Sequence, residues 1–100
     1  MKNPASPTEP EIEDAGQDPT DLAASVEALL FATEKPLTPQ KLSELGELGG
    51  VRNVRRAAKA LNERYEQSGC TFRIVEIAGG YQLQTLPEYN DLIARLHKSR

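Results

Sequence analysis

Two adjacent glycines in the stretch EIAGGYQLQT, residues 76–85, decide which fold the sequence favours. A phosphate-binding loop would need a strand before the glycines and a helix after them. Here the β-rich segment TFRIVEI precedes them, and the alternating segment YQLQT follows as a second strand. The glycines therefore predict the turn of a β-hairpin. They no longer indicate a phosphate-binding loop, which was the strongest candidate for an enzyme site in this sequence.

The polar and apolar pattern of the two segments also predicts how they pair. The predicted loop has three residues: Ala78, Gly79 and Gly80. It pairs Ile77 with Tyr81 and Val75 with Leu83, which gives the hairpin one apolar face near its tip. A three-residue loop also favours a glycine in the left-handed region. A two-residue turn at the glycine pair would mix polar and apolar residues on both faces.

In this register Phe72 and Ile74 lie on the polar side of the hairpin. They would cover a trailing helix there or, as the alternative, meet a partner.

Helix signals divide the rest of the folded part. Pro19 and Pro39 each follow a residue that can cap a helix, which is typical of the first helical position. Three glycines within residues 46–50 predict a turn. The expected helices cover residues 18–33, 38 to about 46, 51–68 and 87–100. Three helices, a two-stranded wing and a trailing helix make a mainly α, winged helix-turn-helix fold.

Helical spacing predicts which residues of these helices face inward. On the second helix they are Leu42 and Leu45, and on the third they are Val51, Val54, Ala58, Leu61 and Tyr65. On the trailing helix they are Tyr89, Leu92, Ile93 and Leu96. The first helix has an apolar stripe of Leu22, Val26, Leu29 and Leu30, and a second apolar side of Ala24, Ala28 and Phe31.

Charge separates the chain into two unlike parts. The first 21 residues carry one lysine and six acidic residues, a net charge of −5, whereas the remaining 79 carry a net charge of +2. The first segment is polar and rich in proline, so it can bury only a little apolar surface. That gain is too small to offset the conformational entropy lost on folding. We expect a disordered acidic tail over residues 1–20, a winged-helix domain over 21–86, and a trailing helix over 87–100.

Several function classes lack support in the sequence. No apolar run approaches the roughly 20 residues that span a bilayer, and the N-terminus lacks the apolar stretch of a secretory signal. The single cysteine, Cys70, fits a reducing cytoplasm. His97, the only histidine, has no ligand at a metal-like spacing, and no serine has a triad partner. We therefore predict no cofactor, metal, membrane contact or catalytic residue.

Two segments together resemble the family of the bacterial segregation and condensation protein B (ScpB). VEALLFATEKPLTPQKLSEL, residues 26–45, is similar to that family's first two helices, in which IEALLFAS precedes a PL turn. VEIAGGYQLQTLPEY, residues 75–89, resembles its wing, which reads close to VAGGYRLVTRPEY. The resemblance covers residues 22 to about 96. The sequence departs from the family at ELGGVRNV, residues 47–54, where the family tends to place acidic residues.

The resemblance implies a non-enzymatic, homodimeric accessory subunit of the bacterial SMC condensin complex. Such a protein would bind the kleisin ScpA, contact SMC through it, and act at the nucleoid in chromosome condensation and segregation. Family members resemble two winged helices in tandem, so a second domain is expected beyond residue 100. The alternative is a winged-helix transcriptional regulator that binds DNA.

Two surfaces are candidates for partner binding. The second side of the first helix (Ala24, Ala28 and Phe31) could form the dimer contact, because small residues let another helix approach and Phe31 can anchor it. The alternative is that this side meets the same core. The third helix groups four basic residues on one side: Arg52, Arg55, Arg56 and Lys59. That side is a solvated polar face, a contact for DNA phosphates, or a contact for an acidic protein.

Overall fold

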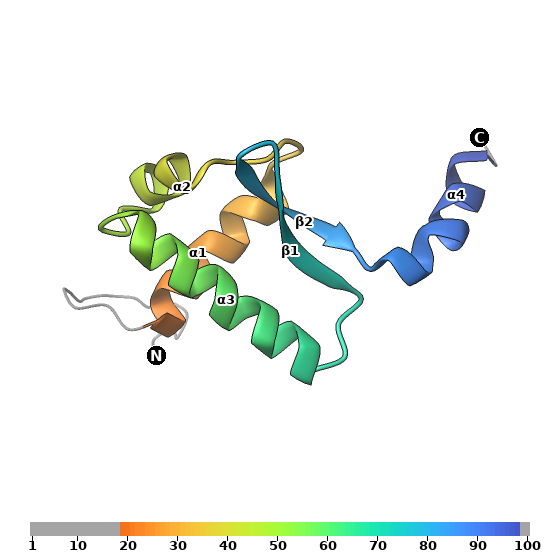
Figure 1. Cartoon of the computed structure of the whole chain (residues 1–100), viewed down its shortest axis with the longest axis horizontal. Coiled ribbons are helices and arrows are strands. Elements are labelled where there is room, and N and C mark those ends of the chain that lie inside the picture. Colours follow the sequence, from red (N-terminus) through yellow and green to blue (C-terminus); the bar gives the residue numbers. More distant parts are fainter. Residues whose placement is uncertain (1–18, 99–100) are drawn as a thin grey trace, which may run out of the picture.

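The computed structural model describes residues 19–98 and confirms the winged-helix architecture (Figure 1). The expected acidic tail lies, through residue 18, outside the described residues and stays a prediction. In chain order the elements are α1 (Pro19–Ala32), α2 (Pro39–Gly46), α3 (Val51–Gln67), β1 (Phe72–Ile77), β2 (Gly80–Thr85), the short 3-10 helix η1 (Pro87–Tyr89) and α4 (Asn90–Lys98).

Local side-chain contacts fix both ends of α2. Thr38 caps its start, since the Oγ1 atom accepts a hydrogen bond from the Lys41 amide at 3.0 Å. At its end, Glu47 adopts a left-handed conformation with φ of 53°. The Ser43 Oγ then accepts a hydrogen bond from the Gly50 amide at 2.8 Å. These contacts hold the short turn that places α3 against the other two helices.

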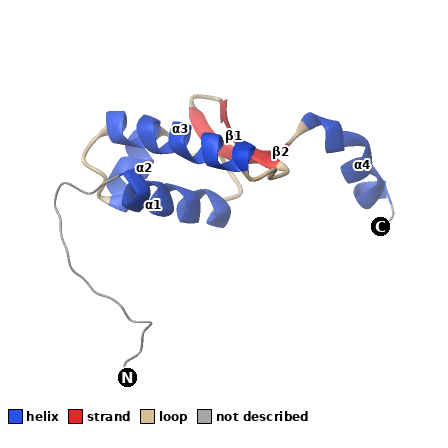
Figure 2. Cartoon of the chain, turned by 90° about the horizontal axis from the view of Figure 1, so that it is seen from below, coloured by secondary structure: helices blue, strands red, loops and turns tan. Residues whose placement is uncertain are grey.

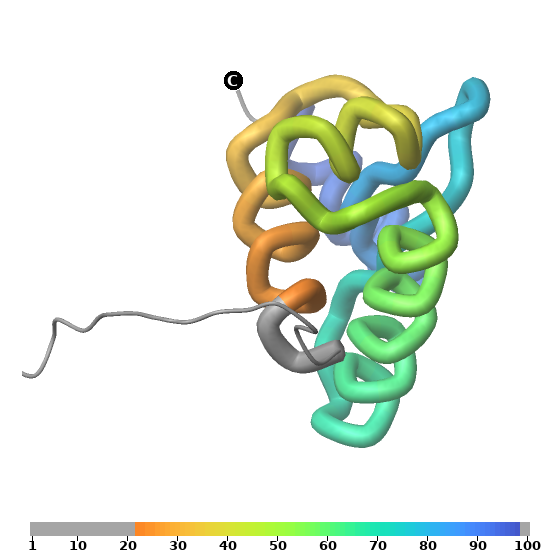
Figure 3. The backbone as a smooth tube through the Cα atoms, turned by 90° about the vertical axis from the view of Figure 1, so that its left-hand side faces the viewer, coloured from red at the N-terminus to blue at the C-terminus, as the bar shows by residue number. Residues whose placement is uncertain are grey.

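One apolar core joins the three helices to the wing. α1 packs most extensively on α3, and α2 closes one end of the pair (Figures 2 and 3). The buried apolar residues are Leu22, Ala23, Val26, Leu30, Leu42, Leu48, Val54, Ala57, Ala58, Leu61, Tyr65, Ile74 and Tyr81.

The inward side of α2 differs from the prediction. Leu42 is buried as expected, but Leu45 is 52% exposed, and the core position is taken by Leu48 instead. The reason is that α2 ends at Gly46, and the left-handed Glu47 turns the chain back toward the core. The amide of Leu48 donates to the Ser43 carbonyl at 2.9 Å, which fixes that reversal.

The predicted register of the hairpin is wrong by one residue. The structure pairs Ile77 with Gly80 and Ile74 with Leu83, so the turn has two central residues, Ala78 and Gly79. Both have left-handed φ values, 53° and 79°, as a type I′ turn requires. The predicted three-residue loop includes Gly80 in the turn and assigns no left-handed conformation to Ala78.

The corrected register reverses the two faces of β1, whereas Tyr81 and Leu83 of β2 stay on the apolar face. Ile74 and Tyr81 are now buried against the helices, with Phe72 and Leu83 packed beside them. Val75 and Ile77, predicted to share the apolar face, point to the other side. The predicted placement of Phe72 and Ile74 on the polar side is therefore wrong as well.

Gly80 belongs to the strand because another backbone lies against it. Leu37, in the turn after α1, forms an antiparallel bridge with Tyr81, with N–O distances of 3.0 and 2.7 Å. A Cβ atom on Gly80 would stand 2.8 Å from the Leu37 carbonyl oxygen. The two segments that carry the family resemblance therefore meet at this bridge, which fastens the wing to the helices.

The other edge of the wing is covered by a side chain. The Asn62 amide donates to the Ile74 carbonyl at 2.9 Å, and its oxygen accepts from the Ile74 amide at 2.8 Å. This pair of bonds imitates a neighbouring strand and satisfies the outward backbone groups of Ile74. It also holds β1 against α3.

The trailing helix leaves the domain. α4 packs mainly on the adjoining η1, and Figures 1 and 2 show it projecting beyond the end of β2. Leu92 is 54% exposed and Leu96 is 63% exposed, and no residue of α4 is buried. The prediction that this helix turns an apolar face inward is therefore wrong for the part of the chain described.

Candidate interaction surfaces

The second apolar side of α1 lies on the surface. Ala24, Ala28 and Phe31, which we call the α1 face, are all exposed, and Phe31 is 63% exposed. Among residues 19–98, this side of α1 therefore does not pack into the core. An exposed phenylalanine beside two small residues is the composition that a packed helix interface uses.

Aromatic rings connect the α1 face to the core. The Phe31 and Phe72 rings meet edge to face, with centroids 5.8 Å apart, and Phe72 meets Tyr65 in the same way at 4.8 Å. Phe72 is half-buried at the start of β1. Phe31 is therefore held in place on the surface by rings below it, which reduces the entropy that a partner must remove on binding.

A hydrogen bond between α1 and α3 fixes the α1 face in position. The Tyr65 phenol donates to the Glu27 carboxylate at 2.7 Å. Burial raises the pKa of Tyr65 above its ordinary value, and the hydrogen bond and charge of Glu27 raise it further. Glu27 neighbours Ala28 in the chain, so this bond sets the rotation of α1 about its axis.

Replacing Tyr65 with phenylalanine should lower the free energy of unfolding at pH 7 by about 1 kcal/mol, because one charge-assisted hydrogen bond is lost. Since the folded pKa is raised, the stabilisation by the phenol is fully present below its unfolded pKa of about 10. It should disappear as the pH rises further toward the folded pKa. Urea unfolding of Tyr65→Phe, Glu27→Gln and the double variant at pH 7 and at higher pH measures the coupling. A coupling that did not change with pH would contradict this assignment.

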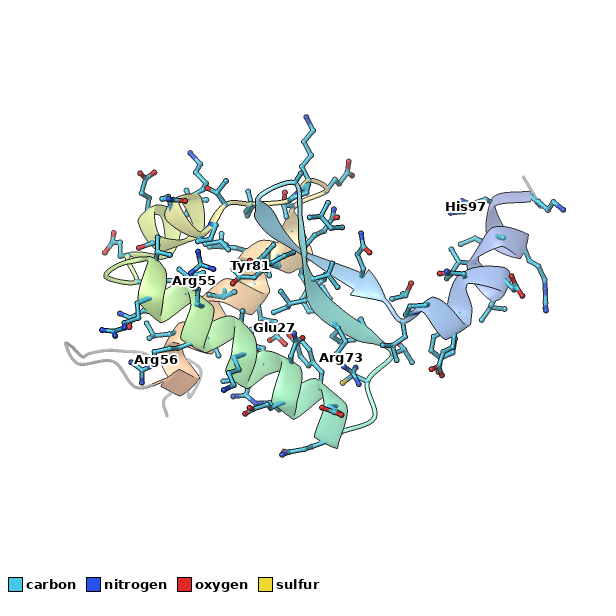
Figure 4. All side chains as sticks on the ribbon, in the orientation of Figure 1. Glu27, Arg55, Arg56, Arg73, Tyr81 and His97 are labelled. Carbon is cyan, nitrogen blue, oxygen red and sulfur yellow. The ribbon has the colours of Figure 1, made fainter. Side chains whose placement is uncertain are left out.

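The four basic residues of α3 are exposed as predicted, but they do not act as one patch. Arg55 faces the wing, where its Nη1 lies 3.7 Å from the Glu76 carboxylate, and Arg56 points away from the wing (Figure 4). Both partners of that ion pair are well exposed, so it contributes little stability. Glu63 and Glu66 lie on the same side of the helix, as helical spacing requires.

An open groove of about 600 Å³ separates α3 from the wing. Its charged lining residues are three basic and three acidic side chains: Arg55, Lys59, Arg73, Glu63, Glu66 and Glu76. Arg73 is already engaged, since its Nη1 donates to the carbonyls of Cys70 and Phe72 at 2.9 and 2.7 Å. A groove with balanced charge has no strong attraction for the phosphate backbone of DNA.

The tip of the wing adds no positive charge to this surface. Ala78 and Gly79 are exposed at the turn, and Gly80 is buried against Leu37.

Among residues 19–98, no group of three histidine, cysteine or acidic side chains is placed to hold a metal ion. Helices long and apolar enough to cross a membrane are likewise not found in that range.

Comparison with known proteins identifies sequence relatives. Residues 24–100 match the family model described as segregation and condensation complex subunit ScpB. A segregation and condensation protein B from Syntrophotalea carbinolica is 39% identical over 83 residues, which are 83% of this chain and 42% of that protein. The chain thus spans about two fifths of the length of this relative.

Solved structures with the same fold are also found. A conserved hypothetical protein from Chlorobium tepidum is 40% identical, with a TM-score of 0.71 over 78% of this chain and 49% of its own. A second structure, described as a dimer of ScpB N-terminal domain complexed with ScpA peptide, has a TM-score of 0.67. It is 23% identical, and the match covers 77% of this chain and 95% of that one.

Proposed function

The chain belongs to the segregation and condensation protein B (ScpB) family, and on that premise we propose that it is a non-enzymatic accessory subunit of a bacterial SMC–kleisin complex. It dimerises through the α1 face and binds the kleisin ScpA, and it contacts SMC through that kleisin. Its role is in chromosome condensation and segregation, in the cytoplasm and at the nucleoid. Residues 21–86 form the winged-helix domain, and α4 leads toward a second one.

The observation that carries this proposal is the uncovered α1 face. A phenylalanine that is 63% exposed, supported by Phe72 and flanked by Ala24 and Ala28, is a surface for protein contact. The matching structure, which shares this fold over nearly its whole length, is described as an ScpB dimer with an ScpA peptide, and that description supports dimerisation and kleisin binding as the role of the fold.

Co-purification with the kleisin encoded in the same genome tests the proposal. We expect affinity-tagged protein to retain that kleisin, using this chain and, where the gene continues, its complete product. The Phe31→Asp variant tests whether retention of the kleisin depends on dimerisation. The tag alone controls for background. A complete gene product that retained no kleisin would overturn the proposed function.

DNA binding separates this proposal from the regulator alternative. Because the charges that line the groove between α3 and the wing are balanced, we expect short duplex DNA to bind the wild type only weakly, and the Arg55→Glu, Arg56→Glu double variant about equally. Fluorescence anisotropy with a salt series measures both affinities. Tight wild-type binding with a steep salt dependence, lost in the double variant, would favour the regulator.

A further inference from the structure

The apolar side of α4 is a second surface that its own domain leaves uncovered. Leu92 is more than half exposed, Ile93 lies beside it half-exposed, and the helix packs mainly on η1 (Figure 1). An amphipathic helix in water gains most of its stability by packing its apolar face against another element. The structure therefore raises the question of what covers this side of α4.

The α1 face alone is too small to hold a dimer. α1 has 14 residues, so it is about 21 Å long at about 1.5 Å per residue. A stripe about 10 Å wide along it offers roughly 200 Å² per copy, whereas stable interfaces bury about 800 Å² per partner. Two α1 faces that met only each other would fall well short. The same chain must supply further contact area.

The point at which α4 leaves the domain lies near the end of the α1 face that carries Phe31. The Phe31 ring contacts Phe72, and Phe72 pairs with Thr85 at the end of β2. The Leu86 amide then donates to the Thr71 carbonyl at 2.8 Å, and η1 begins at the next residue. These contacts connect the α1 face to the point where α4 leaves the domain.

Side-chain size favours close packing of a helix on α1. The small side chains of Ala24 and Ala28 allow the close approach of about 8–10 Å between helix axes. When α4 lies antiparallel to α1, Leu92 near the start of α4 lies beside Phe31 near the end of α1.

We propose that α4 of each copy packs across the α1 face of the other copy, so that the dimer forms by reciprocal exchange of the two trailing helices. Leu92 contacts the partner's α1 face next to Phe31. The exchange covers the α1 face and the apolar side of α4 in one two-fold arrangement, in which every contact occurs twice. This inference rests on the proposed function, because it requires that the chain dimerise.

Cross-linking of mixed copies tests the exchange directly. In a Cys70→Ser background, a tagged Ala28→Cys variant is mixed with an untagged Leu92→Cys variant, and a short bis-maleimide joins cysteines that lie close together. We expect a cross-linked product of mixed mass, which can arise only between two copies. The matched control pairs Leu45→Cys, an equally exposed leucine on α2, with Leu92→Cys and should give about tenfold less product.

The outcomes separate the two proposals. A dimer in sedimentation that cross-links no better than the Leu45 control would overturn the exchange and leave dimerisation standing. Wild-type protein that stayed monomeric would overturn dimerisation itself, and the exchange with it. Cross-linking within one chain of an Ala28→Cys, Leu92→Cys double variant, without mixed product, would show that α4 folds back on its own α1 and would also overturn the exchange.

Discussion

Replacing Gly80 with alanine should lower the free energy of unfolding by about 2–4 kcal/mol, a large part of the roughly 4–10 kcal/mol available to a domain of this size. The added Cβ would stand 2.8 Å from the carbonyl oxygen and 2.9 Å from the carbonyl carbon of Leu37. Both atoms belong to the backbone, so no side-chain rotation can relieve the overlap. The bridge between Leu37 and Tyr81 must open, and both of its hydrogen bonds are lost.

The neighbouring glycine provides the control. A Cβ on Gly79 meets nothing within 4 Å, but the residue has φ of 79°. Gly79→Ala should therefore cost only about 1 kcal/mol, from the left-handed backbone alone. Urea unfolding followed by circular dichroism measures both variants. Equal losses at the two positions would show that the bridge contributes no more than the turn.

Replacing Phe31 with aspartate should weaken self-association by about 100-fold or more. The substitution removes the proposed anchor and places a charge in the interface, and in a two-fold dimer it does so twice. Because the ring is 63% exposed in the single chain, the fold itself should lose little stability. Sedimentation equilibrium over a range of concentrations measures the dissociation constant.

Leu45→Asp is the matched control for this variant. Leu45 is also a large, exposed apolar residue, but it lies on α2, outside the α1 face. It should leave the dissociation constant unchanged. If both variants weakened the dimer equally, the effect would come from added charge in general, and the assignment of the interface to α1 would be wrong.

Much of the fold follows from the sequence because its signals are local. Proline at Pro19 and Pro39 marks the first residue of α1 and α2, and the glycine-rich turn sets the start of α3 at Val51. The order of helices and strands then indicates a winged helix. Each of these signals depends on neighbouring residues, which a single sequence contains.

The predictions that proved wrong concern positions whose structure is determined by a contact with residues distant in the sequence. The hairpin turn falls on Ala78 because Gly80 is required against Leu37, a constraint from another part of the chain. Leu48 replaces Leu45 in the core for a similar reason, since the chain reverses after α2. The helical pattern of α4 indicates an apolar side correctly, but no pattern within one chain identifies the element that covers it.

The bridge between Leu37 and Tyr81 also bears on the order in which the chain becomes stable during synthesis. The segment after α1 leaves the ribosome early, but its backbone partner is made only when translation reaches Tyr81. Contacts between residues so far apart in sequence delay folding until both have emerged. Nascent chains in which the second strand has not yet emerged from the ribosome should therefore be open to proteases along all three helices, and chains in which it has emerged should be resistant.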